Sequence, residues 1–325
     1  MGEARLPADF EPQERCVMAW PGIESKPGSK APDAIEAFAL IAKTIARFEP
    51  VLMLAYPEYV AHAEGTCGGP DIEVVNLPFD DVWIRDSGPL FVVRGGEELV
   101  AVDFRFNRYG WKEIPRERYT ETGILLAERL DIPRSEVPYV LEGGSIASNG
   151  PGTLIAVESS ILTDSRNPGV TRGELEEAFE EFLGINRTIW LERGLVEDET
   201  DGHADNVVLF VSPTRVLCQT VDDPKDPNAE RLAANRAVLE DAGFEVIDFP
   251  VAPGAENRKS RPYLNCFVGN ACLVVPLADV PADEQALDVL RAAFPGREVL
   301  GVPGETLARA GGGVHCITQQ IPLAR

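Results

Sequence analysis

Residues 207–221, VVLFVSPTRVLCQTV, decide the fold class of this chain. Two apolar runs flank a turn at Ser212 and Pro213, which is the pattern of a β-hairpin. Residues 228–243, NAERLAANRAVLEDAG, follow with helical spacing of apolar residues behind a residue that can cap a helix. The unit predicted from this stretch is a strand pair followed by a helix.

The same kinds of segment recur along the chain. Hairpin patterns occupy residues 90–104 and 265–276, and a looser one centres on 153–159. Helical patterns occupy residues 33–48, 171–184 and 282–294. Alternation of strands and helices predicts an α/β protein, and because no linker interrupts it we expect a single domain over residues 1–325. The repeat fits modules around a common axis and a doubly wound sheet equally well.

The charge balance limits the classes of partner. The chain has 53 acidic and 30 basic residues, and its formal net charge is −23. A field of this sign repels polyanions and attracts cations, so we expect a small cationic partner and neither nucleic acid nor a membrane. The first residues lack a secretory signal, and no apolar run approaches membrane-spanning length, which predicts a cytoplasmic location.

The six cysteines are spaced irregularly and contain no CxxC pair. This spacing favours neither a disulfide framework nor a zinc site. We expect five of them to be buried apolar residues. These five are Cys16, Cys67, Cys218, Cys266 and Cys272.

The chain has three histidines, the side chain that acid/base chemistry near neutral pH usually recruits. His62 lies among helix-compatible residues and is expected to be exposed. His315 directly precedes Cys316, so in an extended segment its ring would point away from the thiol, which favours a structural role. In DGHADN, residues 201–206, an extended backbone would project His203 and Asp205 to the same face. A capped turn entering a buried strand is the alternative for that motif.

Two further motifs place carboxylates next to apolar runs. In PFDDVWIRDSGP, residues 78–89, Asp86 lies in a predicted polar turn. Trp83 in the same motif is either a core residue or a flat wall for the stem of a substrate. In LEGG, residues 141–144, Glu142 precedes two glycines that allow close approach of the backbone to a ligand.

The strongest motif is GGGVHCITQQIP, residues 311–322. Three consecutive glycines predict positive φ angles or a close backbone approach. Cys316 follows this turn, and a thiol in such a place is a candidate nucleophile.

Taken together, WIRDSGP, LEGGSI, DGHADN and GGGVHCITQQIP resemble, in this order, the agmatine deiminase and bacterial peptidylarginine deiminase family. RCVMAWPG, ILTDSRNPG and RPYLNCFVGNACLVVP look like further segments of that family, so the resemblance covers nearly the whole chain. It implies a single-domain, five-bladed α/β propeller of ββαβ modules, the pentein fold of guanidino-group-modifying enzymes.

The resemblance also implies the chemistry. It assigns Cys316 as the nucleophile, His203 as the general acid and base, and Asp86 with Asp205 as the carboxylates that hold a guanidinium. Glu142 and Trp83 would be supporting residues of the substrate site. The implied reaction is hydrolysis of agmatine to N-carbamoylputrescine and ammonia, a step of polyamine metabolism towards putrescine, through a covalent S-alkylthiouronium intermediate and without a cofactor or metal.

Alternatives remain open on the sequence alone. The substrate could be another guanidine, such as free or peptidyl arginine or a precursor of a specialised metabolite, because residues 107–115 depart from the family pattern. An amidinotransferase with the same nucleophile and a non-catalytic guanidinium-binding protein are further alternatives. The oligomeric state, including a homo-oligomer, is not determined by these motifs.

Overall fold

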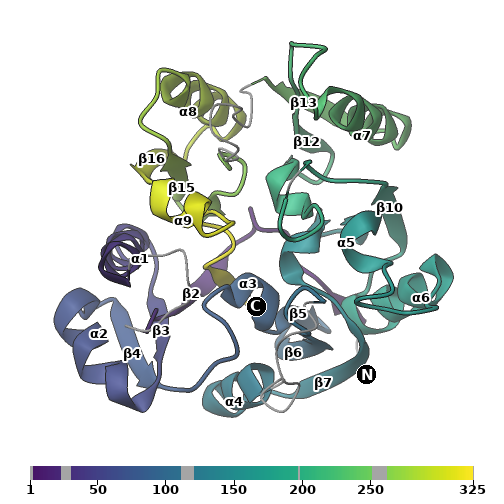
Figure 1. The fold of residues 1–325 in the computed structure, drawn as a ribbon. Coiled ribbons are helices and arrows are strands. Elements are labelled where there is room, and N and C mark those ends of the chain that lie inside the picture. The colour runs from purple at the N-terminus through teal and green to yellow at the C-terminus, as the bar shows by residue number, and fades with distance from the viewer. Residues whose placement is uncertain (1–2, 23–30, 111–120, 197, 251–261, 325) are drawn as a thin grey trace.

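The computed structural model describes residues 3–22, 31–110, 121–196, 198–250 and 262–324. Their strands form five separate sheets of three or four strands, so the single doubly wound sheet is excluded. In Figure 1 the long helices α1, α2, α4, α6, α7 and α8 lie around the outside of the molecule, whereas the short helices α3 and α9 lie nearer its centre. The bounds of these helices are α1 Ala31–Ile45, α2 Val60–Cys67, α3 Ile84–Ser87, α4 Glu121–Leu130, α6 Arg172–Leu183, α7 Ala229–Asp241, α8 Ala282–Ala293 and α9 Glu305–Arg309.

The opening hairpin is confirmed. Strand β11 (Val208–Ser212) pairs antiparallel with β12 (Arg215–Gln219), and β13 (Glu245–Phe249) pairs parallel with β12. Parallel neighbours need a crossover connection, and helix α7 supplies it between β12 and β13. The unit is therefore ββαβ.

Three other sheets repeat this order of an antiparallel pair, a helix and a parallel strand. The crossover helices are α4, α6 and α8. The strands are β5 Leu90–Arg94, β6 Glu98–Arg105 and β7 Arg134–Val140; β8 Ile146–Ser148, β9 Thr153–Val157 and β10 Arg187–Leu191; and β14 Phe267–Val268, β15 Cys272–Leu277 and β16 Glu298–Pro303.

The fifth sheet joins the two ends of the chain. Strand β17 (Gln319–Pro322) pairs antiparallel with β2 (Gln13–Ala19). Strands β3 (Val51–Ala55) and β4 (Ile72–Asn76) follow in parallel after α1 and α2. The remaining strand, β1 (Ala4–Arg5), extends the sheet of β5. The pairing of β17 with β2 holds the C-terminal motif in place, because β17 begins three residues after Cys316.

Helix α6 illustrates why these segments are helical. Thr171 and Glu174 form a reciprocal capping box at its start, and Gly184 ends it with a φ of 70°. Its apolar face buries Leu175 and Phe179 in the core, and each such side chain contributes about 1.5–3 kcal/mol when fully buried. Its glutamates face solvent.

The first strand of each antiparallel pair is preceded by a short polar segment. These segments are α3 before β5, the 3₁₀ turn η3 (Gly143–Ser145) before β8, η4 (Ala204–Asn206) before β11, residues 263–266 before β14 and residues 311–318 before β17. These segments lie next to one another, because α3 contacts η3, η3 contacts η4, and Asn265 donates hydrogen bonds to Asn206 and to Cys316.

The remaining short elements are the 3₁₀ turn η1 (Pro57–Tyr59) and helix α5 (Glu158–Ile161). None of the helices within the described ranges has the length and apolar content needed to span a membrane.

Candidate active site

Polar side chains from two of these segments, those at α3 and η4, meet at Gly144, which lies in a third segment, η3. A Cβ atom added to Gly144 would lie 2.5 Å from Nδ1 of His203 and 2.9 Å from both Oδ2 of Asp205 and Oδ1 of Asp86. All three side chains are buried. The fold thus brings together three of the residues singled out from the sequence, and glycine is required where they meet because no Cβ fits there.

The thiol of Cys316 adjoins this cluster. Its Sγ lies 3.5 Å from Oδ2 of Asp205 and accepts a hydrogen bond from Nδ2 of Asn265 at 3.1 Å. Asn265 also accepts a hydrogen bond from the backbone N–H of Cys316 at 3.1 Å, so one amide orients both ends of the residue. Burial and the charges of Asp205 and Asp86 raise the pKa of Cys316 well above its ordinary value. Without a cation in the site, the sulfur is therefore a neutral thiol.

The glycine turn before Cys316 has the geometry expected from the sequence. Gly311 has a φ of 99°, and a Cβ on Gly312 would lie 2.7 Å from the ring of Trp83 and 3.2 Å from Sγ of Cys316. Trp83 is half-buried and also packs against a core cluster. Its ring therefore belongs to the core, as one of the two expectations had it, and also covers the turn that carries the thiol, while its role as a wall for a substrate stem stays a prediction.

Asp86 is held by donors from two other segments. Its Oδ1 accepts a hydrogen bond from the N–H of Gly144 at 2.9 Å, and its Oδ2 accepts one from the hydroxyl of Tyr109 at 3.1 Å. Burial raises the pKa of Asp86 to about 6, and although His203 opposes the shift, the charges of Asp205 and Glu142 add to it. Asp86 therefore changes charge near neutral pH.

Asp205 lies between the thiol and the second buried histidine. Its Oδ2 is 2.9 Å from Nδ1 of His315, while its buried Oδ1 has no hydrogen-bond partner within the described residues. Burial acts to raise the pKa of Asp205, but the hydrogen bond and charge of His315 outweigh it, so the pKa is lowered. Asp205 is an anion with one oxygen free.

His203 faces two carboxylates. Its Nε2 lies 3.2 Å from Oε2 of Glu142, and its Nδ1 lies 3.7 Å from Oδ1 of Asp86, beyond hydrogen-bond distance. Burial alone would lower the pKa of His203, but Asp86, Glu142 and then Asp205 outweigh it and raise the pKa to about 9. The ring is therefore an imidazolium at neutral pH.

Glu142 is held in place by Arg166. Nε of Arg166 lies 2.8 and 2.9 Å from its two carboxylate oxygens, and both side chains are fully buried. Arg166 in turn contacts Asp201 at 2.6 Å and the carbonyl of Thr200 at 3.0 Å. Glu142 consequently orients His203 from a rigid position.

Two details of the sequence-based prediction are wrong. The segment carrying His203 and Asp205 is not extended, because residues Ala204–Asn206 form a 3₁₀ turn that brings both side chains to the cluster. The segment around Asp86 is one turn of helix rather than a loop. Side-chain contacts decide both cases: Asn206 donates a hydrogen bond to Asp198, and the hydroxyl of Ser87 donates to backbone carbonyls.

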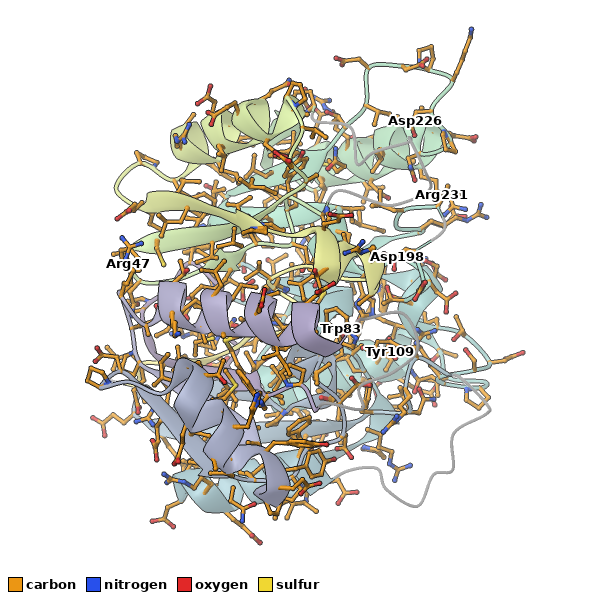
Figure 2. All side chains as sticks on the ribbon, turned by 60° about the vertical axis from the view of Figure 1, so that its left-hand side comes forward. Arg47, Trp83, Tyr109, Asp198, Asp226 and Arg231 are labelled. Atoms are coloured by element: carbon orange, nitrogen blue, oxygen red, sulfur yellow. The ribbon has the colours of Figure 1, made fainter. Side chains whose placement is uncertain are left out.

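Several residues of the site were missed by the sequence analysis. Tyr109, Arg166 and Asn265 lie in segments that were noticed without these side chains being singled out, and Asp9 lies in an N-terminal stretch that carries no motif. Tyr109 has a φ of 60°, an unusual conformation for a bulky residue, and it follows Arg108 with a φ of 54°. Figure 2 shows Tyr109 and Trp83 in the same part of the molecule, with Asp198 above them in that view.

Other predictions concern residues outside the cluster. His62 is exposed, as expected, and accepts a hydrogen bond from the indole of Trp20 at 3.3 Å. The five other cysteines are buried, and burial raises the pKa of each thiol, so they behave as apolar core residues. Within the described residues, no group of three or more His, Cys, Asp or Glu side chains is arranged to hold a metal ion.

The arrangement suits attack on the carbon of a planar cation. Two carboxylates can each accept paired N–H donors of such a group, as in arginine–carboxylate pairs. A thiol beside them can act as a nucleophile once it is deprotonated, and a buried imidazolium can donate a proton to a leaving group. The two carboxylates and the imidazole lie around Gly144, and the thiol adjoins them at Asp205.

Comparisons with known proteins agree with this chemistry. The family model of Porphyromonas-type peptidyl-arginine deiminases matches residues 5–322. An agmatine deiminase of Stutzerimonas stutzeri is 37% identical over 98% of this chain and 95% of its own length, and one of Pseudomonas aeruginosa is 35% identical over 99% and 96%. The solved structure of an Enterococcus faecalis agmatine deiminase has a TM-score of 0.91 at 26% identity, covering 99% of this chain and 97% of that one. The match over almost the entire length means that this chain belongs to the Porphyromonas-type peptidyl-arginine deiminase family.

Proposed function

We propose that this protein hydrolyses agmatine to N-carbamoylputrescine and ammonia, with Cys316 as the nucleophile. One observation carries the proposal: the side chains of His203 and Asp205 meet beside a thiol, and each has one buried polar atom, Nδ1 of His203 and Oδ1 of Asp205, without a hydrogen-bond partner in the described chain. Buried polar atoms are normally paired, so these two are suited to a polar ligand. Relatives that are agmatine deiminases support the choice of ligand.

Asp86 and Asp205 would hold the guanidinium between them. The group is planar and cationic, and its N–H donors match two facing carboxylates. Binding of this cation lowers the pKa of Asp86 and of Cys316, because it offsets the negative charges that raise them without ligand. The substrate thus helps to generate the thiolate that attacks it, while Trp83 forms a wall beside the reacting carbon.

The first half of the reaction forms a bond from the sulfur of Cys316 to the guanidinium carbon. The carbon–nitrogen bond to one terminal amino group then breaks, and this group leaves as ammonia after taking a proton from the His203 imidazolium. The enzyme is left with a covalent S-alkylthiouronium and a neutral His203.

The second half restores the thiol. His203 removes a proton from water, the oxygen attacks the thiouronium carbon, and the carbon–sulfur bond breaks to release a ureido product. His203 is the imidazolium again once it has taken the proton from water, and the sulfur leaves as thiolate. The proton on the new hydroxyl of the product passes to the sulfur, which restores the thiol. The proton balance closes because the same imidazole serves as acid and then as base, and because the thiol proton lost to solvent when substrate binds converts the released ammonia to ammonium. Glu142 stabilises its charged form throughout.

An exposed carboxylate near the turn that carries Cys316 supports a substrate with a free ammonium at its far end. A Cβ on Gly311 would lie 3.1 Å from Oε2 of the exposed Glu199, which places a carboxylate next to the turn that carries Cys316. Agmatine presents an ammonium there, whereas arginine would add a carboxylate and be repelled. This contrast favours agmatine over free arginine.

The test is ammonia release and product identification with agmatine, free arginine and a peptidyl-arginine substrate. We expect turnover of agmatine by the wild type and no measurable turnover by Cys316→Ala. Cys67→Ala is the matched control, since this buried thiol lies on helix α2 outside the site and should leave activity intact. Full activity of Cys316→Ala would disprove the nucleophile, and turnover confined to an arginine substrate would disprove the substrate.

We further propose that the five sheets are the blades of a five-bladed propeller forming one domain over residues 1–325. Five repeats of an antiparallel pair followed by a parallel strand support this architecture. The peripheral position of the long helices in Figure 1 agrees with it. We place the enzyme in the cytoplasm, where reduced thiols such as Cys316 persist.

A further inference from the structure

A second histidine, which the proposed reaction does not use, lies against the site. His315 is buried, with a side-chain exposure of 6%, and both of its ring nitrogens face carboxylates. Nδ1 lies 2.9 Å from Oδ2 of Asp205, and Nε2 lies 3.1 Å from Oδ2 of Asp9. We propose that His315 is a positioning residue, held as an imidazolium between Asp205 and Asp9, that keeps Asp205 ionised and turned towards the guanidinium. The proposal rests on the proposed function.

The hydrogen-bond geometry requires the charge. A carboxylate only accepts hydrogen bonds, and a neutral imidazole has one donor and one acceptor nitrogen. With carboxylate oxygens at 2.9 and 3.1 Å from its two nitrogens, the ring can satisfy both contacts only with a proton on each. Burial acts to lower the pKa of His315 and Arg85 adds to this, but Asp205 and Asp9 outweigh both, so the pKa is raised.

The two buried histidines are arranged alike but held differently. His203 lies between Asp86 and Glu142, and His315 lies between Asp205 and Asp9, so each carboxylate proposed to bind substrate has a histidine with a second acid behind it. His203 leaves Nδ1 unbonded, which suits a group that transfers protons. His315 has both nitrogens bonded and is therefore suited to orienting, not to proton transfer.

Asp9, which contacts His315 on the side opposite Asp205, is also held in place. Oδ1 of Asp9 accepts a hydrogen bond from Nε2 of Gln320, and Nη1 of Arg85 lies 4.0 Å from the same oxygen. These contacts and His315 lower the pKa of Asp9 against the opposing effect of burial. Asp9 therefore remains an anion and stabilises the imidazolium from the side opposite Asp205.

The consequence for Asp205 is both electrostatic and geometric. It lies near the charges of Asp86 and His203, and its Oδ2 faces His315 and the thiol of Cys316. Occupation of Oδ2 leaves Oδ1 as the oxygen available to substrate. Without the imidazolium, Asp205 would lie buried near other carboxylates, and of the two histidines in the described ranges that lower its pKa only His203 would be left. It would then take up a proton more easily and lose its fixed orientation.

The first experiment measures the protonation of the ring directly, without reference to turnover. The chain has three histidines, so ¹⁵N-histidine NMR spectra can be assigned with His62→Asn, His203→Asn and His315→Asn. We expect both ring nitrogens of His315 to carry protons at neutral pH in the wild type, and the titration to move to lower pH in Asp9→Asn. A neutral ring at pH 7 would overturn the proposal.

The second experiment separates positioning from folding. In His315→Asn the amide can still donate one hydrogen bond to Asp205 but carries no charge, and Asp9→Asn is nearly isosteric. We expect KM for agmatine to rise about 10- to 100-fold in His315→Asn, the range for a lost charge-assisted hydrogen bond, with a smaller loss in kcat. Asp9→Asn should change KM in the same direction by a smaller factor. The acidic limb of kcat/KM should move to higher pH in both variants.

The control is His62→Asn, which changes an exposed histidine outside the site and should behave as the wild type. A purely structural role would reduce the fraction of folded enzyme, and so lower kcat while leaving KM and the pH profile unchanged. That result, with circular dichroism recorded on each variant, would overturn the proposal. Failure of the proposed function would look different, because the wild type itself would then not turn over agmatine, while the NMR result would be unaffected.

Discussion

Gly144 is a crowded residue of the candidate site. Its Cα lies where Asp86, His203 and Asp205 converge, and the nearest of these atoms would be 2.5 Å from an added Cβ. Real Cβ atoms essentially never approach other heavy atoms so closely. Since these neighbours are buried side chains tied to further partners, they cannot move aside without breaking the contacts that orient them.

We therefore expect Gly144→Ala to lower kcat/KM for agmatine by at least about 100-fold, because a misplacement of about 1 Å in a catalytic group can cost that much. Gly65→Ala is the matched control, since nothing lies within 4 Å of its added Cβ and the glycine belongs to helix α2. Steady-state kinetics on both variants provide the check. Unchanged kinetics in Gly144→Ala would show that this cluster is not where the reaction occurs.

The charges of Asp86 and His203 set the expected pH dependence. Asp86, with a pKa of about 6, must lose its proton to hold a cation, so activity should rise as pH passes through 6. His203, with a pKa of about 9, must keep its proton to release ammonia, so activity should fall as pH passes through 9. A bell-shaped profile of kcat/KM with these limbs is expected for the free enzyme. A profile that keeps rising above pH 10 would contradict the role of His203.

At the scale of elements, short polar segments carry the site and regular elements hold them. Each segment enters the first strand of an antiparallel pair, so its end is fixed by a sheet, while its own backbone is a single helical turn or an irregular stretch of at most eight residues. Such turns have few internal hydrogen bonds and depend on contacts made by their side chains. The buried pair of Arg166 and Glu142 is one of these contacts, because it joins the segment after α5 to the segment before η3.

Arg166→Met should destabilise the protein by about 3–5 kcal/mol, the usual effect of leaving one partner of a buried ion pair uncompensated. Denaturant unfolding at pH 7 measures the change. Arg236→Met is the control: the side chain of this arginine is 35% exposed and pairs with the half-exposed Glu240 and Asp248, so its loss should cost no more than about 1 kcal/mol. Equal effects of the two substitutions would show that the buried ion pair contributes no more to the free energy of unfolding than the surface pairs do.

At the scale of the whole molecule, the net charge of −23 acts on any charged ligand. Opposite charges attract at long range until salt screens them, and the screening length is about 10 Å at 0.1 M salt. A dication such as agmatine should feel this attraction more strongly than a monocation with the same guanidinium group.

We expect kcat/KM for agmatine to fall by about 2- to 10-fold between low salt and 0.5 M salt, as is usual for electrostatically assisted association. Binding of an alkylguanidine with an uncharged tail, measured as competitive inhibition, should show a weaker dependence on salt. Equal salt dependence of the two ligands would mean that the overall field makes no contribution.

The fold was predictable to the level of its elements. The hairpin in residues 207–221 and the helix over 228–243 were correct because their periodicity reflects burial of one face, which is a local property of the sequence. The repeated strand and helix segments in the sequence did not distinguish five separate sheets from one doubly wound sheet, because strand partners depend on contacts between distant residues. Strands β17 and β2 lie at opposite ends of the chain, and the sequence of neither strand alone predicts that the two pair.

The amino-acid sequence by itself determined which residues are the candidates for chemistry. Glycine turns, a scarce histidine and a thiol after three glycines are visible in the chain because each type of side chain has its reactivity wherever it lies. Only the tertiary structure decided the contacts and the pKa of each of these groups. Asp9 carries no motif and reaches Asp205 through His315, and Tyr109 reaches Asp86 across a gap of more than twenty residues. Burial and the distance between charges set the pKa of each group, and both quantities exist only once the chain has folded.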